Sequence, residues 1–148
     1  MQAIAEQIHI ILKDYQSDYD GRKYEITVAH IIEWANQFGD DALFVLTELL
    51  HFLPEVYISK EKAKELLRAR LLEIQEFYGY KTMNEMVVNT HFFNVQKVYK
   101  SQPEILSLVD EILQTEFMVD YKVSIDTPKK NYIYFDDVLA TGGTVYRD

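Results

Sequence analysis

The sequence contains no cysteine and few residues that bend the backbone, with five glycines and three prolines among 148 residues. The absence of cysteine excludes a disulfide framework and any metal site built from thiolates. Basic residues are also scarce, because 15 Lys and Arg stand against 24 Asp and Glu and give a net charge of −9. Such an acidic chain lacks the broad positive surface that binds nucleic acid, so we expect no nucleic-acid partner.

Long apolar runs are missing too. No stretch of eighteen or more apolar residues occurs, and no basic segment followed by an apolar run opens the chain. We therefore expect no membrane span, no signal peptide and a cytoplasmic location. The four histidines lie far apart without the i, i+4 spacing of helical metal ligands, so we expect them to be packed or surface side chains.

Two common phosphate-binding motifs are absent. Neither Gly-x-x-x-x-Gly-Lys-Ser/Thr nor Gly-x-Gly-x-x-Gly occurs, so the sequence lacks the signatures of P-loop and dinucleotide sites. Hydrophobic residues make up 48% of the chain, which is ample for a core.

Helical patterns dominate the first 118 residues. Thr27, Ser59 and Ser101 are the expected N-caps, and Pro54 is expected to end the third helix. That third helix is apolar nearly all round, so we predict that it is central and buried. Residues 16–22 are predicted to form a polar turn. The helices are expected at residues 3–14, 28–38, 41–53, 60–77 and 101–117, with a short one after Thr82.

The chain changes character near residue 118. Residues 121–125 and 132–135 are β-prone, as in the strands of an α/β fold. We predict a mainly helical domain over residues 1–118 and the beginning of an α/β domain over residues 119–148, which looks truncated. A strand without neighbours has unpaired edges, so we also expect association with a second copy or another protein.

The most specific pattern lies in the last eighteen residues. The apolar strand at residues 132–135 is followed by Asp136 and Asp137, and then by a small-residue loop. Glycines let consecutive N–H groups converge on a phosphate, and the helix expected to begin after the loop adds attraction for the anion. Carboxylates at the carboxyl end of a strand suit ribose hydroxyls or Mg²⁺. The pattern predicts a ribose 5-phosphate site. The loop residues are Ala140, Thr141, Gly142, Gly143 and Thr144.

A structural alternative remains open for this stretch. A buried strand can end in a polar turn whose acidic residues merely cap the next helix. The adjacent Asp136-Asp137 pair together with Thr-Gly-Gly-Thr at this spacing favours the ligand site.

At these residues the chain resembles the type I phosphoribosyltransferases, which use phosphoribosyl pyrophosphate. The resemblance implies that Asp136 and Asp137 bind the 2′- and 3′-hydroxyls and act as catalytic residues, and that the loop from Ala140 to Thr144 binds the 5′-phosphate. It implies a Rossmann-like α/β domain, a small phosphoribosyl ligand and Mg²⁺ that accompanies the pyrophosphate. From the residues themselves we expect no metal site built by the protein alone. A nitrogen nucleophile would displace the pyrophosphate at the anomeric carbon.

The helical block bears a second resemblance. Trp34, Gln37 and Phe38, followed by a Leu-rich helix and then Tyr57 and Ser59, are similar to the N-terminal region of phosphoribosyltransferase-like proteins from bacterial conflict and defence loci.

Upstream of the acidic pair the sequence shows no convincing pyrophosphate loop. Gly79 is the one candidate, and it lies between Tyr78 and Tyr80. We therefore expect N-glycosidic transfer only if further residues complete the site. The alternative is a non-catalytic regulatory or interaction protein that acts through its helical block, with the phosphate loop as a sensor or relic.

Overall fold

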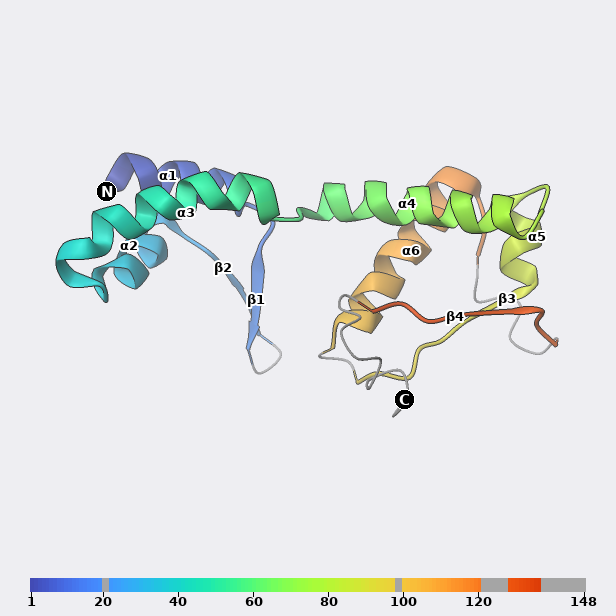
Figure 1. Cartoon of the computed structure of the whole chain (residues 1–148). Helices are drawn as coiled ribbons and strands as arrows, with labels where there is room; N and C mark the ends of the chain where they lie inside the picture. Colours follow the sequence, from blue (N-terminus) through green and yellow to red (C-terminus); the bar gives the residue numbers. More distant parts are fainter. Residues whose placement is uncertain (20–21, 98–99, 121–127, 137–148) are drawn as a thin grey trace. The chain divides into compact units, whose positions relative to one another are not determined.

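The computed structural model describes residues 1–19, 22–97, 100–120 and 128–136 (Figure 1). The chain divides into two compact units, unit 1 at Met1–Lys62 and unit 2 at Ala63–Asp148. The described part is mainly helical, as predicted. The helices are α1 (Gln2–Ile11), α2 (Val28–Asn36), the 3-10 turn η1 (Gly39–Asp41), α3 (Ala42–Val56), α4 (Lys60–Phe77), α5 (Met83–Val88) and α6 (Ser101–Phe117).

Unit 1 packs α1, α2 and α3 around a small apolar core. Half of its fully or nearly fully buried residues are alanines, which allow the three helices to approach closely. Thr27 begins α2 as predicted, because its hydroxyl accepts a hydrogen bond from the His30 N–H at 3.2 Å. The buried residues are Ala5, Ile8, Ile31, Ala35, Ala42 and Leu46.

The prediction for the third helix is wrong in two respects. The helix α3 continues through Pro54 to Val56, because the Tyr57 N–H bonds to the Leu53 carbonyl at 2.8 Å and closes the last turn around the proline. It is also far from buried. Phe44 is 65% exposed and Phe52 is 58% exposed, because only one face of α3 has neighbouring helices within unit 1.

The segment after α1 is a hairpin rather than the expected polar turn. Strand β1 (Gln16–Tyr19) pairs in antiparallel fashion with β2 (Arg22–Glu25), with Gln16 opposite Glu25. The alternation of residue types here was too weak to indicate a strand.

By length and composition, the helical stretch Gly39–Phe77 is apolar enough to cross a membrane. Core helices of soluble proteins share that property, so it assigns no location.

Unit 2 packs α4, α5 and α6 against a two-stranded sheet. Strands β3 (Thr90–Phe92) and β4 (Asn131–Ile133) run parallel, and α6 lies between them in the sequence. The Ser59 hydroxyl accepts a hydrogen bond from the Lys62 N–H at 3.2 Å, so the predicted cap of α4 is confirmed. The core consists of apolar side chains from all three helices and both strands. Its fully or nearly fully buried members include Leu71, Met83, Met86, Val87, Phe92, Leu106, Val109, Ile112, Leu113 and Val119.

The start of α6 and the end of α4 are both set by backbone conformation. Ser101 is not the cap of α6, since Lys100 has the extended backbone of an N-cap and Ser101 is already helical. Gly79 ends α4 with a φ of +69°, and its N–H bonds to the Glu76 carbonyl at 2.9 Å.

Candidate functional site

The predicted site strand is a parallel strand of unit 2. Its register places Asn131 opposite Thr90 and Ile133 opposite Phe92. The Phe93 N–H bonds to the Ile133 carbonyl at 2.9 Å and continues the ladder by one residue. The sequence predicted a strand over residues 132–135, and the strand observed is Asn131–Ile133, so the element is confirmed with shifted ends.

One face of the β3–β4 pair is anchored in the core. The rings of Phe92 and Phe135 stack with centroids 6.1 Å apart and an interplanar angle of 4°. Phe92 is only 7% exposed, and Ile133 packs against the same core cluster. Burial of these side chains fixes β4 along its length, because a displaced strand would expose apolar surface.

The other face of the pair carries four aromatic rings. His91 belongs to β3 and Phe93 is the residue after it. Both lie next to tyrosines of the neighbouring strand segment, His91 next to Tyr132 and Phe93 next to Tyr134. The His91 and Phe93 centroids are 5.0 Å apart, and the Phe93 and Tyr132 centroids are 5.9 Å apart. Side chains alternate between the faces of a strand, so the sequence from Tyr132 to Phe135 places two rings on this face and two apolar groups on the core.

The beginning of β4 is held by hydrogen bonds to the segment around α5. The N–H groups of Lys130 and Asn131 both bond to the Asn89 carbonyl, at 2.9 and 3.1 Å. The Asn131 side chain donates to the Tyr80 hydroxyl at 2.7 Å. The strand is therefore fixed at its amino end by polar contacts in addition to its apolar core face.

The carboxyl end of β4 is held by one buried side chain, that of Gln102 in the first turn of α6. Its Oε1 accepts hydrogen bonds from the Val95 N–H at 2.9 Å and the Gln96 N–H at 3.1 Å. Its Nε2 donates to the Phe135 carbonyl at 3.2 Å. The residue is fully buried, so all three bonds are shielded from water.

Gln96 adds a second connection to the same strand end. Its side chain donates to the Tyr134 hydroxyl at 2.7 Å. Together, Gln96 and Gln102 fix the two residues that precede Asp136 to the loop after β3 and to α6. The side chains of Gln96 and Gln102 thus hold the two residues that follow β4.

Asp136 directly follows this fixed end and is partly buried. It lies where the chain leaves a parallel strand at its carboxyl end, the edge at which ligands of α/β sheets bind. The other predicted site residues lie outside the described part of the chain. These are Asp137, Ala140, Thr141, Gly142, Gly143 and Thr144.

Comparison with protein families decides the assignment. The PRTase-CE family model matches residues 31–148, which is most of the chain. The chain belongs to the PRTase-CE family. The phosphoribosyltransferase-like resemblance is therefore confirmed, whereas the link to defence loci stays a prediction. No curated protein and no solved structure matches the chain.

The PRTase-CE match covers all of unit 2 and begins inside α2 of unit 1. It includes the described strand end at Asp136 and the whole predicted phosphate loop. The helix α1 and the hairpin β1–β2 lie before the matched residues.

Within the described residues of this PRTase-CE protein, no group of three or more His, Asp or Glu side chains could hold a metal ion. Mg²⁺ in phosphate sites is commonly bound by one or two carboxylates together with the phosphates of the substrate. Among the described residues at the carboxyl end of β4, Asp136 is a carboxylate with the donor chemistry for that arrangement.

Gln102, Gln96 and Tyr134 were missed by the sequence analysis. One signal was available, because Gln102 occupies the first position of a stripe that continues through Leu106, Val109 and Leu113. A polar residue in an otherwise apolar stripe of a helix indicates a buried hydrogen-bonded side chain.

Proposed function

We propose that the chain binds a ribose 5-phosphate group, as part of a phosphoribosyl pyrophosphate-type ligand, at the carboxyl end of β4. Asp136 and Asp137 accept hydrogen bonds from the ribose hydroxyls, and the loop Ala140–Thr144 binds the 5′-phosphate. The observation that carries the proposal is the position of Asp136 at the fixed end of a parallel strand in a chain of the PRTase-CE family.

The finer fold assignment belongs to this proposal. A parallel pair connected through a helix, as β3, α6 and β4 are, is the repeating unit of a Rossmann-like α/β sheet. We propose that β3 and β4 begin the phosphoribosyltransferase-like sheet and that the phosphate loop follows at its carboxyl edge.

The proposed chemistry places negative charge beside the reacting sugar. During displacement at the anomeric carbon, positive charge develops on the ribose ring. The carboxylates of Asp136 and Asp137 orient the ring through its hydroxyls and stabilise that charge. Bound Mg²⁺ would neutralise the leaving pyrophosphate.

Transfer also needs a backbone turn for the pyrophosphate. The two described glycines, Gly39 and Gly79, both have positive φ values, +58° and +69°, and both follow helices. Gly79 completes the end of α4, so its N–H is already engaged with Glu76. We therefore propose that the chain binds the ligand and that transfer requires a pyrophosphate loop outside the described residues.

Calorimetry tests this proposal. Phosphoribosyl pyrophosphate with Mg²⁺ is titrated into the full chain and into the variant Asp136→Asn/Asp137→Asn, which keeps the size of both side chains. We expect the double variant to lose binding by about tenfold or more, since charged hydrogen bonds contribute about 1.5–3 kcal/mol each. Glu104→Gln, an exposed charge removal on α6, is the matched control and should bind as the wild type does.

Separate titrations with ribose 5-phosphate and with pyrophosphate assign the affinity to one end of the ligand. Binding of ribose 5-phosphate alone is the expected result. Equal affinity of wild type and double variant for phosphoribosyl pyrophosphate would refute the site.

A second candidate function is regulatory, with the phosphate loop as a sensor and no transfer. The engagement of Gly79 in the end of α4 favours it. Ligand binding without turnover on any nitrogen base would support this candidate, and product formation from a labelled phosphoribosyl donor would exclude it.

A further inference from the structure

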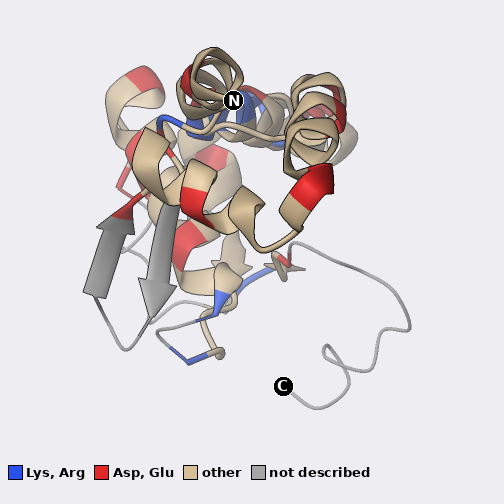
Figure 2. Cartoon of the chain, turned by 90° about the vertical axis from the view of Figure 1, so that its left-hand side faces the viewer, with Lys and Arg blue, Asp and Glu red and all other residues tan. Residues whose placement is uncertain are grey.

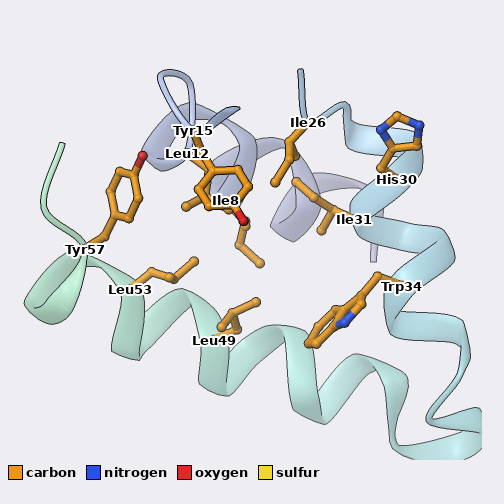
Figure 3. Close-up of a pocket in the computed structure, with 10 residues that line it drawn as sticks. All are labelled: Ile8, Leu12, Tyr15, Ile26, His30, Ile31, Trp34, Leu49, Leu53 and Tyr57. Atoms are coloured by element: carbon orange, nitrogen blue, oxygen red, sulfur yellow. The ribbon is translucent and has the colours of Figure 1, made fainter. Parts of the chain in front are cut away.

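Unit 1 contains an apolar groove between α1, α2 and α3 (Figure 3). Its volume is about 560 Å³, within the size range of ligand and side-chain binding sites in proteins. We call it the unit 1 groove. Its lining residues are Ile8, Leu12, Tyr15, Ile26, His30, Ile31, Trp34, Leu49, Leu53 and Tyr57.

The groove exists because the centre of unit 1 is built from small residues. Close helix approach at the alanines leaves the larger side chains farther out only partly covered, including Leu12, Leu49 and Leu53. Two aromatic residues on the rim are half exposed, since Trp34 and Tyr15 each retain 44% of their surface in water. Exposed aromatic rings beside an apolar groove are typical of the residues that carry binding energy in interfaces.

The dimensions of the groove suit a helix. Leu49, Leu53 and Tyr57 follow one another along one side, as Figure 3 shows. With a rise of 1.5 Å per residue, these three positions span about 12 Å, or roughly two helical turns. An amphipathic helix that presents apolar residues at i, i+4 and i+7 spans about 10.5 Å, which is a similar length.

The net charge of the helices that form the groove selects among partners. From Ile26 to Ser59 the chain contains no Lys or Arg, but it contains Glu33, Glu48 and Glu55 on α2 and α3 and two aspartates in η1. Figure 2 shows where Asp and Glu (red) and Lys and Arg (blue) occur along the backbone. A second copy of this chain, with net charge −9, would bring like charges together.

We propose that the unit 1 groove binds a basic amphipathic helix of a partner protein. Apolar residues on one face of that helix fill the groove against Trp34 and Leu53, and its Lys and Arg residues are attracted to the acidic helices α1, α2 and α3, which contain no Lys or Arg. The proposal is independent of the phosphoribosyl site, because no lining residue belongs to unit 2.

The single tryptophan of the chain lies on the rim, so its emission reports the groove directly. The probe is a synthetic amphipathic helical peptide of about 16 residues, without Trp, with Leu on one face and Lys on the other. Added to the full chain, it should shift the Trp34 emission to shorter wavelength, and added salt should weaken the binding several-fold. A peptide with Glu in place of each Lys should not bind.

Variants are compared by the anisotropy of a labelled peptide. Trp34→Ala and Tyr15→Ala change half-exposed residues on two sides of the groove, and each should weaken binding by about tenfold or more. Phe52→Ala is the matched control, because Phe52 is an exposed aromatic residue of α3 outside the groove. Its affinity should stay within about twofold of the wild type. Thermal unfolding establishes that each variant is folded.

Three results would overturn the proposal. The first is equal binding of the Lys and Glu peptides, which would mean unselective apolar adsorption. The second is unchanged binding in both Trp34→Ala and Tyr15→Ala. The third is a concentration-dependent dimer that buries Trp34 without peptide, which would make a second copy the occupant.

Discussion

Among the described polar residues of unit 2, Gln102 should be the one whose substitution lowers stability most. It is fully buried, and its amide makes three hydrogen bonds that join α6, the loop after β3 and the end of β4. The change Gln102→Leu keeps the approximate volume but leaves two N–H groups and one carbonyl without a partner.

The expected loss is large for a polar residue. Each hydrogen bond contributes about 1 kcal/mol net, and a buried group left without a partner costs about 1–3 kcal/mol. We therefore expect Gln102→Leu to lower the free energy of unfolding of unit 2 by about 3 kcal/mol. Gln114→Leu, an exposed change on the same helix, should cost less than about 0.5 kcal/mol.

The variant Gln102→Glu tests the hydrogen bond that Gln102 donates separately from the two that it accepts. In Gln102→Glu the carboxylate still accepts from the Val95 and Gln96 N–H groups, but it faces the Phe135 carbonyl without a proton. Burial should raise the pKa of this carboxyl above its ordinary value of about 4.3. The protonated acid can donate to the carbonyl, so the deficit should be small below that value and grow as the pH rises through the folded pKa.

Amide hydrogen exchange of α6 is the suitable measurement. Trp34, the single tryptophan, lies in unit 1 and would report only that unit. Exchange is measured at pH 5 and pH 7.5 for wild type, Gln102→Leu, Gln102→Glu and Gln114→Leu. Equal protection of α6 in Gln102→Leu and Gln114→Leu would refute the role assigned to the buried amide.

Two further predictions concern helix ends. Partial burial raises the pKa of Asp14, but hydrogen bonds from the Lys60 N–H at 2.5 Å and the Tyr57 hydroxyl at 2.7 Å lower it more, so the pKa lies below the ordinary 3.8. Asp14→Asn should therefore lower the free energy of unfolding by about 0.5–1 kcal/mol at pH 7, after allowance for solvent screening. The difference in stability between wild type and variant should vanish as the pH falls below 3.8 through the folded pKa. Urea unfolding followed by tryptophan emission measures it. Gly79→Ala should cost about 1 kcal/mol because of the φ of +69°, and Gly79→Asn should cost less; calorimetric melting of both variants checks this, and a more stable Ala variant would contradict it.

Local signals predicted the helices well. The Thr82 hydroxyl accepts a bond from the Glu85 N–H at 3.1 Å, as the Thr-x-x-Glu pattern indicated. The Glu85 carboxylate reaches back to the Lys81 N–H at 2.9 Å. Caps and apolar stripes depend on residues three or four positions apart, so they can be read from the sequence.

Burial was harder to predict, because it depends on which elements are neighbours. The composition of α3 indicated a central helix, yet Phe44 and Phe52 are exposed. An apolar helix surface predicts that something covers it without saying what. The prediction that Ser101 caps α6 was wrong for another reason. The N-cap is decided by backbone angles, and Lys100 has the extended backbone of an N-cap.

The candidate site could be predicted from the sequence only in part. Asp136 follows from a short motif that is continuous in the sequence. Gln102 lies 33 residues before the carbonyl that it holds, so only the three-dimensional fold connects them. The ends of β4 likewise depend on its pairing with β3, and the sequence of residues 132–135 carries no information about that pairing.

The parallel pairing of β3 with β4 also has a consequence for how the chain folds during synthesis. Thr90 can pair only after Asn131, its partner 41 residues later, has been synthesised. The contacts among the three helices of unit 1, by contrast, can be complete once residue 56 has emerged. At about 5–20 residues per second, a ribosome needs roughly 2–8 s to deliver that stretch. During this interval Phe92 and the apolar face of α6 lack their strand neighbour, so the nascent unit 2 is the part of the chain most open to chaperones and aggregation.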